Sequence, residues 1–106
     1  MDIQLKRGML DACVLSVLDK GDSYGYQMIK DISPGVDISE STLYPILKRL
    51  ESGNFIVFYT MEHNGRLRKY YRITDAGRRR LDEFVNEWQE VIKVYNFIIS
   101  GRGGTL

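Results

Sequence analysis

The chain has 106 residues, of which 43% are hydrophobic and 27% charged, and its formal net charge is +1. This is the size of one small globular domain with room for one additional element. No apolar run approaches the roughly 20 residues of a membrane span, and the start, Met1-Asp2-Ile3-Gln4, lacks the layout of a signal peptide. The single cysteine, Cys13, has no disulfide partner, so we expect a cytoplasmic protein.

The charges are segregated along the chain, although they nearly cancel in sum. A basic stretch between His63 and Arg80 contains one acid, Asp75, and acids concentrate directly after it. Segregated positive charge is typical of a nucleic-acid-binding surface. The cations are Arg66, Arg68, Lys69, Arg72, Arg78, Arg79 and Arg80.

Two helices are expected first. One runs from about Gln4 to Asp19, and its segment from Ala12 to Leu18 is apolar nearly all round. A helix of this kind is buried on more than one side, which suggests a second subunit. Asp22 or Ser23 is expected to cap the next helix, which ends near Ile32.

The third helix is expected to begin near Ser39 or Ser41 and to end near Ser52. Pro45 has no N–H group, so we expect it close to the first turn. The buried face is predicted by helical spacing and consists of Leu43, Ile46, Leu47 and Leu50.

A β-hairpin and a long helix complete the chain. Residues 55–60 read as a strand, Asn64-Gly65 as a two-residue turn, and residues 66–73 as the return strand. Three helices and a two-stranded wing form a winged helix-turn-helix. We therefore predict a mainly α fold with a β-hairpin: a DNA-binding domain over residues 1–74, a dimerisation helix over 75–99 and a disordered tail over 100–106.

The exposed face of the third helix is the candidate surface for reading DNA. Short hydroxyls, an aromatic ring and cations at the start of such a helix reach base edges and phosphates in the major groove. A merely solvated helix face is the alternative. The residues are Ser41, Thr42, Tyr44, Pro45, Lys48 and Arg49.

The hairpin supplies positive charge beside its turn. Arg66, Arg68 and Lys69 follow the tip His63-Asn64-Gly65, and we expect them to contact phosphates or the minor groove. Lys69 is expected to reach out from the hairpin. The alternative is a charged strand edge that discourages aggregation.

An apolar stripe marks the last helix. A stripe this long exceeds what one small domain covers, so we expect it to pair with a second copy; the alternative is a helix folded back on its own domain. Trp88 lies mid-stripe and fits either a ligand pocket or interface packing. The predicted interface residues are Leu81, Phe84, Val85, Trp88, Val91, Ile92, Tyr95 and Ile99.

We expect no catalysis, metal or cofactor. The only histidine, His63, falls at a predicted turn tip, and Cys13 lies in an apolar run. The chain shows no metal-ligand spacing and no glycine loop for phosphate.

Three segments together resemble the PadR family of bacterial transcriptional regulators, in its smaller subfamily with a single C-terminal helix. They are Tyr24-Gly25-Tyr26, residues 41–51 and residues 68–77. The resemblance implies a dimeric winged-helix repressor of palindromic operator DNA, in which Lys69 and Tyr70 belong to the wing motif. It also implies a candidate effector pore between subunits, lined here by Leu5, Gly8, Met9, Ala12, Trp88 and Ile92.

Two other functions fit the same pattern. One is a winged-helix module that binds a protein partner, and the other is a ligand-carrying dimer whose DNA-reading heads are vestigial. Steep loss of DNA affinity with salt separates a DNA-binding protein from both.

Overall fold

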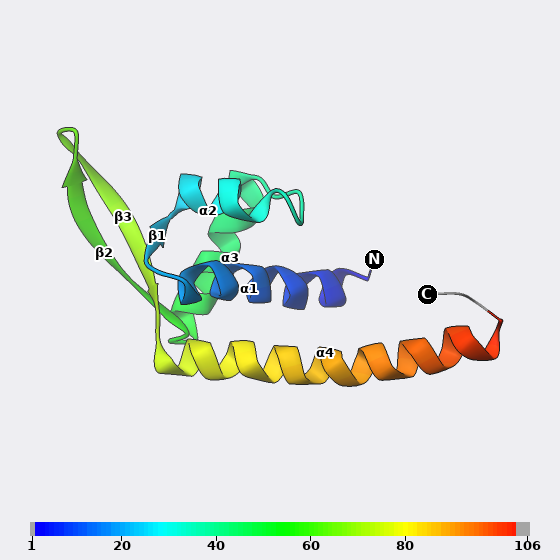
Figure 1. Ribbon diagram of the computed structural model, residues 1–106. Helices are drawn as coiled ribbons and strands as arrows, with labels where there is room; N and C mark the ends of the chain where they lie inside the picture. Colours follow the sequence, from blue (N-terminus) through cyan, green and yellow to red (C-terminus); the bar gives the residue numbers. More distant parts are fainter. Residues whose placement is uncertain (1, 104–106) are drawn as a thin grey trace.

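The computed structural model describes residues 2–103 and consists of three helices, a small sheet whose first strand precedes the second helix, and a long final helix (Figure 1). The sheet is antiparallel, in the order β1-β3-β2, and β2 and β3 form the wing. The elements are α1 (Ile3–Asp19), β1 (Ser23–Tyr24), α2 (Gly25–Ile32), α3 (Glu40–Ser52), β2 (Ile56–His63), β3 (Arg66–Ile73) and α4 (Asp75–Gly101).

Local chemistry sets the helix starts. The Asp2 carboxylate accepts hydrogen bonds from the N–H groups of Gln4 and Leu5, both at 3.1 Å, and so caps α1. The Thr74 hydroxyl accepts from the Gly77 N–H at 3.1 Å and donates to the Asn54 carbonyl at 2.7 Å. Thr74 thereby caps α4 and fixes its first turn to the segment that precedes β2.

One core holds α1, α2, α3 and the base of the wing together. Side chains from all four meet there, and Val14, Met28 and Leu43 have no exposed surface. Full burial of one such side chain stabilises the fold by about 1.5–3 kcal/mol. The predicted inner face of α3 is confirmed, since its buried residues are Leu43, Ile46, Leu47 and Leu50.

The hairpin turn is confirmed in detail. Asn64 and Gly65 have φ values of 52° and 79°, which are the two left-handed residues that a tight turn between twisted strands needs. His63 pairs with Arg66 across the turn. The wing projects from the helical body, as Figure 1 shows on the left.

The start of α2 differs from the prediction. Neither Asp22 nor Ser23 caps the helix; instead Ser23 and Tyr24 form β1, which pairs with Tyr71 and Tyr70 of β3. Tyr24 is the N-cap residue and makes no side-chain capping bond. A two-residue strand is too short to show a periodic sequence pattern. β1 forms only because it pairs with β3, which lies far along the chain.

Pro45 also differs from the prediction, because it lies inside α3 rather than in the first turn. It cannot donate to the Ser41 carbonyl, which a regular helix would satisfy. Ser41 is exposed, so water or a bound molecule can hydrogen-bond that carbonyl instead.

The final helix is longer than predicted and runs beyond the domain. Its 27 residues give it a length of about 40 Å; α1 runs alongside its first part, and α4 then extends past the N-terminal end of α1 (Figure 1). It ends at Gly101, so Ser100 and Gly101 are helical rather than part of a tail; residues 104–106 of the predicted tail lie outside the described residues. None of the helices within residues 2–103 is long and apolar enough to cross a membrane.

Candidate nucleic-acid interface

The outer face of α3 presents the polar residues expected there. Ser41, Thr42, Tyr44, Pro45, Lys48 and Arg49 are all exposed. The Ser39 hydroxyl lies 2.9 Å from that of Ser41 and 3.3 Å from that of Thr42, so the helix starts with a cluster of three hydroxyls. Such groups donate to phosphates and to base edges.

Tyr44 rests against the start of α2. A Cβ atom added at Gly25 would lie 2.6 Å from the Tyr44 Oη and 3.2 Å from its Cζ. Any other residue at position 25 would force the hydroxyl end of Tyr44 to shift, so glycine allows the ring its present position. Sequence reasoning had Gly25 only in the family motif and did not identify its role in placing Tyr44.

Aromatic rings hold the wing cations in place. The Arg68 guanidinium lies 4.0 Å from the Tyr24 ring centroid, and the Lys69 ammonium lies 3.9 Å from that of Phe58. Cations held over ring faces lose less conformational freedom when they bind a partner. Lys69 therefore lies across its own hairpin. This differs from our expectation that it reaches out from the hairpin.

Tyr70 is a packing residue of the wing's outer face. Its ring stacks on Tyr59 at 5.6 Å and meets the edge of Tyr24 at 5.5 Å. Tyr70 thus links β1, β2 and β3. It lies beside the cations but is half-buried among these rings.

Asp22 ties this aromatic cluster to the turn before β1. Its carboxylate accepts from the Arg72 guanidinium at 2.8 Å and from the Tyr59 hydroxyl at 2.6 Å. These hydrogen bonds, that of Arg72 foremost, lower the pKa of Asp22, and the bond to Asp22 raises the pKa of Tyr59. Sequence reasoning had Asp22 only as a candidate helix cap and Arg72 only as one of the cations; it missed their pairing, because the two residues are 50 positions apart.

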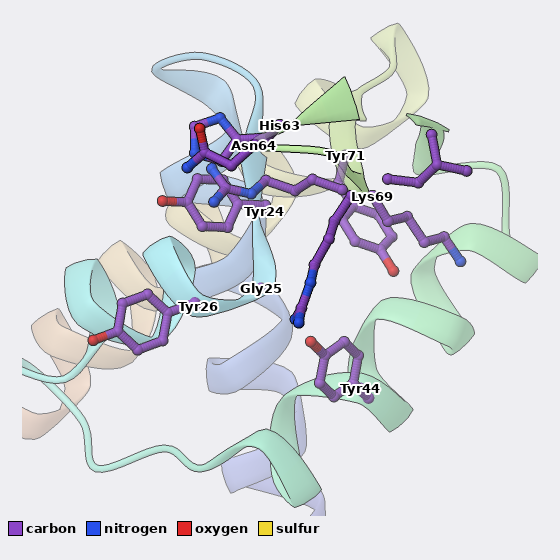
Figure 2. Close-up of a pocket in the computed structure, with 11 residues that line it drawn as sticks. Tyr24, Gly25, Tyr26, Tyr44, His63, Asn64, Lys69 and Tyr71 are labelled. Atoms are coloured by element: carbon purple, nitrogen blue, oxygen red, sulfur yellow. The ribbon is translucent and has the colours of Figure 1, made fainter. Parts of the chain in front are cut away.

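A hollow of about 640 Å³ joins α3 to the wing. Figure 2 shows Tyr24 below His63 and Asn64, and Tyr44 reaching from α3 toward Gly25. Arg66, Arg68 and Lys69 also line it, and none of the described residues around it is acidic. Cations and aromatic rings around one hollow suit the sugar-phosphate backbone of a nucleic acid.

Three arginines outside the wing are paired with carboxylates. Arg49 is ion-paired with Asp11 of α1, so this residue of the predicted reading surface also joins two helices. Arg78 lies 3.3 Å from Asp19 and 3.2 Å from Asp75, and Arg80 lies 3.7 Å from Glu83. Arg66, Arg68 and Lys69 of the wing, in contrast, form no ion pair with any residue between 2 and 103.

His63 and Cys13 are the two side chains that we considered for catalytic chemistry. His63 is exposed at the wing tip, and Cys13 is half-buried in α1, where burial raises the pKa of its thiol. A raised pKa disfavours the reactive thiolate. No cluster of three metal-ligating residues occurs within the described part of the chain.

Comparison with known proteins gives the family. The model of the transcriptional regulator PadR-like family matches residues 14–83, which include α2, α3 and the wing. The chain belongs to this family. It is a DNA-binding transcriptional regulator and not an enzyme, and the predicted winged helix-turn-helix fold is confirmed.

Three relatives of this PadR-like regulator show how far the likeness extends. A transcriptional regulator from Clostridium thermocellum is 37% identical with a TM-score of 0.82, over 91% of this chain and 98% of that one. Transcriptional regulator Rv3488 of Mycobacterium tuberculosis is 32% identical over 76% of each chain. Bacillus subtilis PadR in complex with operator DNA is 28% identical with a TM-score of 0.66, over 72% of this chain and 46% of that one.

The apolar stripe of α4 in this PadR-like regulator divides into two parts. Leu81, Phe84 and Trp88 are half-buried, and the Trp88 ring lies 5.8 Å from that of Phe84. Val91, Ile92 and Tyr95 are 45–57% exposed. Of the other predicted interface residues, Val85 is exposed and Ile99 half-buried.

The residues proposed for an effector pore lie along one side of α1 and α4. Ala12 is buried, Gly8, Met9 and Trp88 are half-buried, and Leu5 and Ile92 are exposed. Met9 and Ala12 line a groove of about 400 Å³ between α1 and α4. We call it the α1–α4 groove; Cys13, Val17, Val36, Leu81, Phe84 and Val85 complete its apolar wall.

Proposed function

We propose that this PadR-like regulator binds a palindromic operator as a homodimer and represses transcription from it. The observation that carries the proposal is the acid-free hollow that joins the outer face of α3 to the wing cations. In this account Ser41, Thr42, Tyr44 and Lys48 contact the major groove. Arg66, Arg68 and Lys69 contact the adjacent backbone.

One relative supports this account. Bacillus subtilis PadR is named a negative transcriptional regulator, and the structure of its complex with operator DNA matches 72% of this chain. Repression by the present chain is tested with a reporter gene placed behind its operator. Expression is expected to fall when the regulator is supplied, and a rise would show an activator instead.

DNA binding is tested by fluorescence anisotropy over a series of salt concentrations. Each phosphate contact contributes a slope of about −0.9 in log K against log salt. Replacing Lys69 by Gln removes one contact from each subunit of the dimer, so it is expected to make the slope shallower by about two, whereas Lys93→Gln on α4 leaves it unchanged. Absence of binding even at low salt contradicts the proposal and favours a protein-interaction module.

The homodimer rests on two apolar surfaces of this chain. The distal half of α4 exposes Val91, Ile92, Val94, Tyr95 and Ile98, all at least 45% exposed, and the α1–α4 groove is apolar too. Contiguous apolar surface of this kind marks an interaction site. A second copy supplies a matching helix, and two-fold symmetry fits a palindromic site.

Sedimentation at micromolar concentrations tests the dimer. We expect the wild-type chain to sediment as a dimer and Ile92→Asp as a monomer, because a carboxylate would have to be desolvated in the interface. Glu90→Gln, on the same part of α4, is the control and is expected to stay dimeric. A monomeric wild-type chain contradicts the proposal.

An effector bound between the subunits is the finer part of the proposal. Leu5, Gly8, Met9, Ala12, Trp88 and Ile92 present an apolar surface, which fits a small apolar or aromatic molecule. Such a molecule would change the angle between the two DNA-reading heads and release the operator. Because Trp88 is the only tryptophan, its fluorescence reports binding directly. If Trp88→Leu leaves effector affinity and DNA release unchanged, the pocket is elsewhere.

A further inference from the structure

A second cationic surface borders α3, on the side away from the wing. It is a groove of about 280 Å³ between the first two turns of α1 and the start of α3, which we call the α1–α3 groove. Leu10 and Ile46 form its floor and are only 5% and 4% exposed. Lys6 and Arg7 stand on its α1 side, and Thr42 stands on its α3 side.

The positive charge of this groove is not neutralised within the described chain. Neither Lys6 nor Arg7 forms an ion pair with any residue between 2 and 103, and both are exposed. Two carboxylates at the start of α1 and within it are engaged elsewhere. Asp2 accepts the N–H groups at the start of α1, and Asp11 is paired with Arg49.

The groove is continuous with the proposed reading surface. Ser41, Thr42 and Pro45 belong both to its lining and to the exposed face of α3. Tyr44, at the opposite edge of that face, lines the hollow beside the wing. Successive residues of a helix are 100° apart, so Tyr44 and Thr42 are separated by about 160° across the face.

This arrangement brackets α3 between two sets of cations. When a helix enters the major groove, which is about 12 Å wide, phosphate backbones run along both of its sides. The wing cations face one backbone, and Lys6 and Arg7 are placed for the other. The ion pair between Asp11 and Arg49 fixes α1 against α3, so that the two sets keep a constant separation.

We propose that Lys6 and Arg7, beside the α1–α3 groove, bind the phosphate backbone of the duplex that α3 reads, on the side of α3 opposite the wing. The proposal rests on the proposed DNA-binding function and extends its footprint to α1. Such contacts position the protein on DNA without reading sequence, so they contribute equally to all duplexes.

The test uses the full chain and a duplex selected for tight binding. The variant is Lys6→Gln/Arg7→Gln, and the matched control is Lys20→Gln/Arg102→Gln, which removes the same charges from the far ends of α1 and α4. Each loses two positive charges from exposed positions. Thermal melting by circular dichroism checks that both variants keep the fold.

The slope of log K against log salt is expected to become shallower by about four in the Lys6/Arg7 variant, because each of the two subunits loses two phosphate contacts, and to stay unchanged in the control. The same loss is expected on an unrelated duplex. An unchanged slope in the Lys6/Arg7 variant overturns the proposal.

A second measurement locates the phosphate contacts along the duplex. Single phosphates are replaced by neutral methylphosphonates along the selected duplex. We expect some replacements to weaken the wild type but not Lys6→Gln/Arg7→Gln, and a different set to weaken the wild type but not Lys69→Gln. The two sets should lie on opposite sides of the base pairs that α3 contacts.

The outcomes separate this proposal from the function on which it rests. A wild-type chain that binds no duplex contradicts the proposed function itself. A wild type that binds, with no phosphate whose effect depends on Lys6 and Arg7, contradicts only the present inference. In that case the α1–α3 groove serves another partner, such as a second copy of the chain.

Discussion

Gly25 offers a direct way to displace Tyr44 without touching DNA or the core. Gly25 is buried at the first residue of α2, and a Cβ there would approach the Tyr44 Oη to 2.6 Å. Ordinary van der Waals contact begins near 3.4 Å, so Gly25→Ala forces the hydroxyl end of Tyr44 to move by about 0.8 Å.

We expect Gly25→Ala to have a small effect on stability and a large effect on DNA binding. Alanine favours a helix over glycine by up to about 1 kcal/mol, and a shifted tyrosine rotamer costs about 0.5–1.5 kcal/mol. The free energy of unfolding should therefore change by no more than about 1 kcal/mol. A hydrogen bond from Tyr44 to a charged group of the duplex is worth about 1.5–3 kcal/mol, so affinity should fall by about 10- to 100-fold.

A double-mutant cycle with Tyr44→Phe tests this reasoning by anisotropy on the selected duplex. Removing the hydroxyl removes the closest contact, so Gly25→Ala should cost much less affinity in the Tyr44→Phe background. Gly35→Ala, whose Cβ meets only the Ile32 carbonyl at 3.7 Å, is the control. Equal losses in the two backgrounds, or wild-type binding by Gly25→Ala, refute the placement of Tyr44 as the cause.

Two further predictions concern stability. Gly77→Ala puts a Cβ 2.2 Å from the Phe55 carbonyl oxygen, which belongs to the backbone and cannot move away. The melting temperature should therefore fall by several degrees. Gly101→Ala is the control and should leave it unchanged, because a Cβ there has no neighbour within 4 Å. Asp22 has a lowered pKa because Arg72 hydrogen-bonds its charged form, so its stabilising contribution is present above about pH 4 and is lost as pH falls. The difference in urea stability between wild type and Asp22→Asn should thus be clear at pH 7 and shrink at pH 3; a constant difference contradicts this assignment.

The parts of the fold that were predictable from sequence are those set by nearby residues. Helical spacing identified the buried and exposed faces of α3, because both follow from a 3.6-residue period. Asn64-Gly65 identified the wing turn, because both residues accept positive φ.

The parts that were missed depend on residues far apart in the chain. β1 exists only because Ser23 and Tyr24 meet β3, some 46 to 48 residues later. The pairing of Asp22 with Arg72 has the same origin. No local pattern shows that Arg49 forms an ion pair with Asp11, or that Lys6 and Arg7 lie beside Thr42.

Selection from a library of random duplexes at about physiological salt tests the central claim most directly. We expect the wild-type chain to recover a palindromic motif of two half-sites, and Tyr44→Ala and Lys48→Ala to lose it. Recovery of tight binders with no shared motif, or the same motif with both variants, would contradict sequence-specific reading by α3.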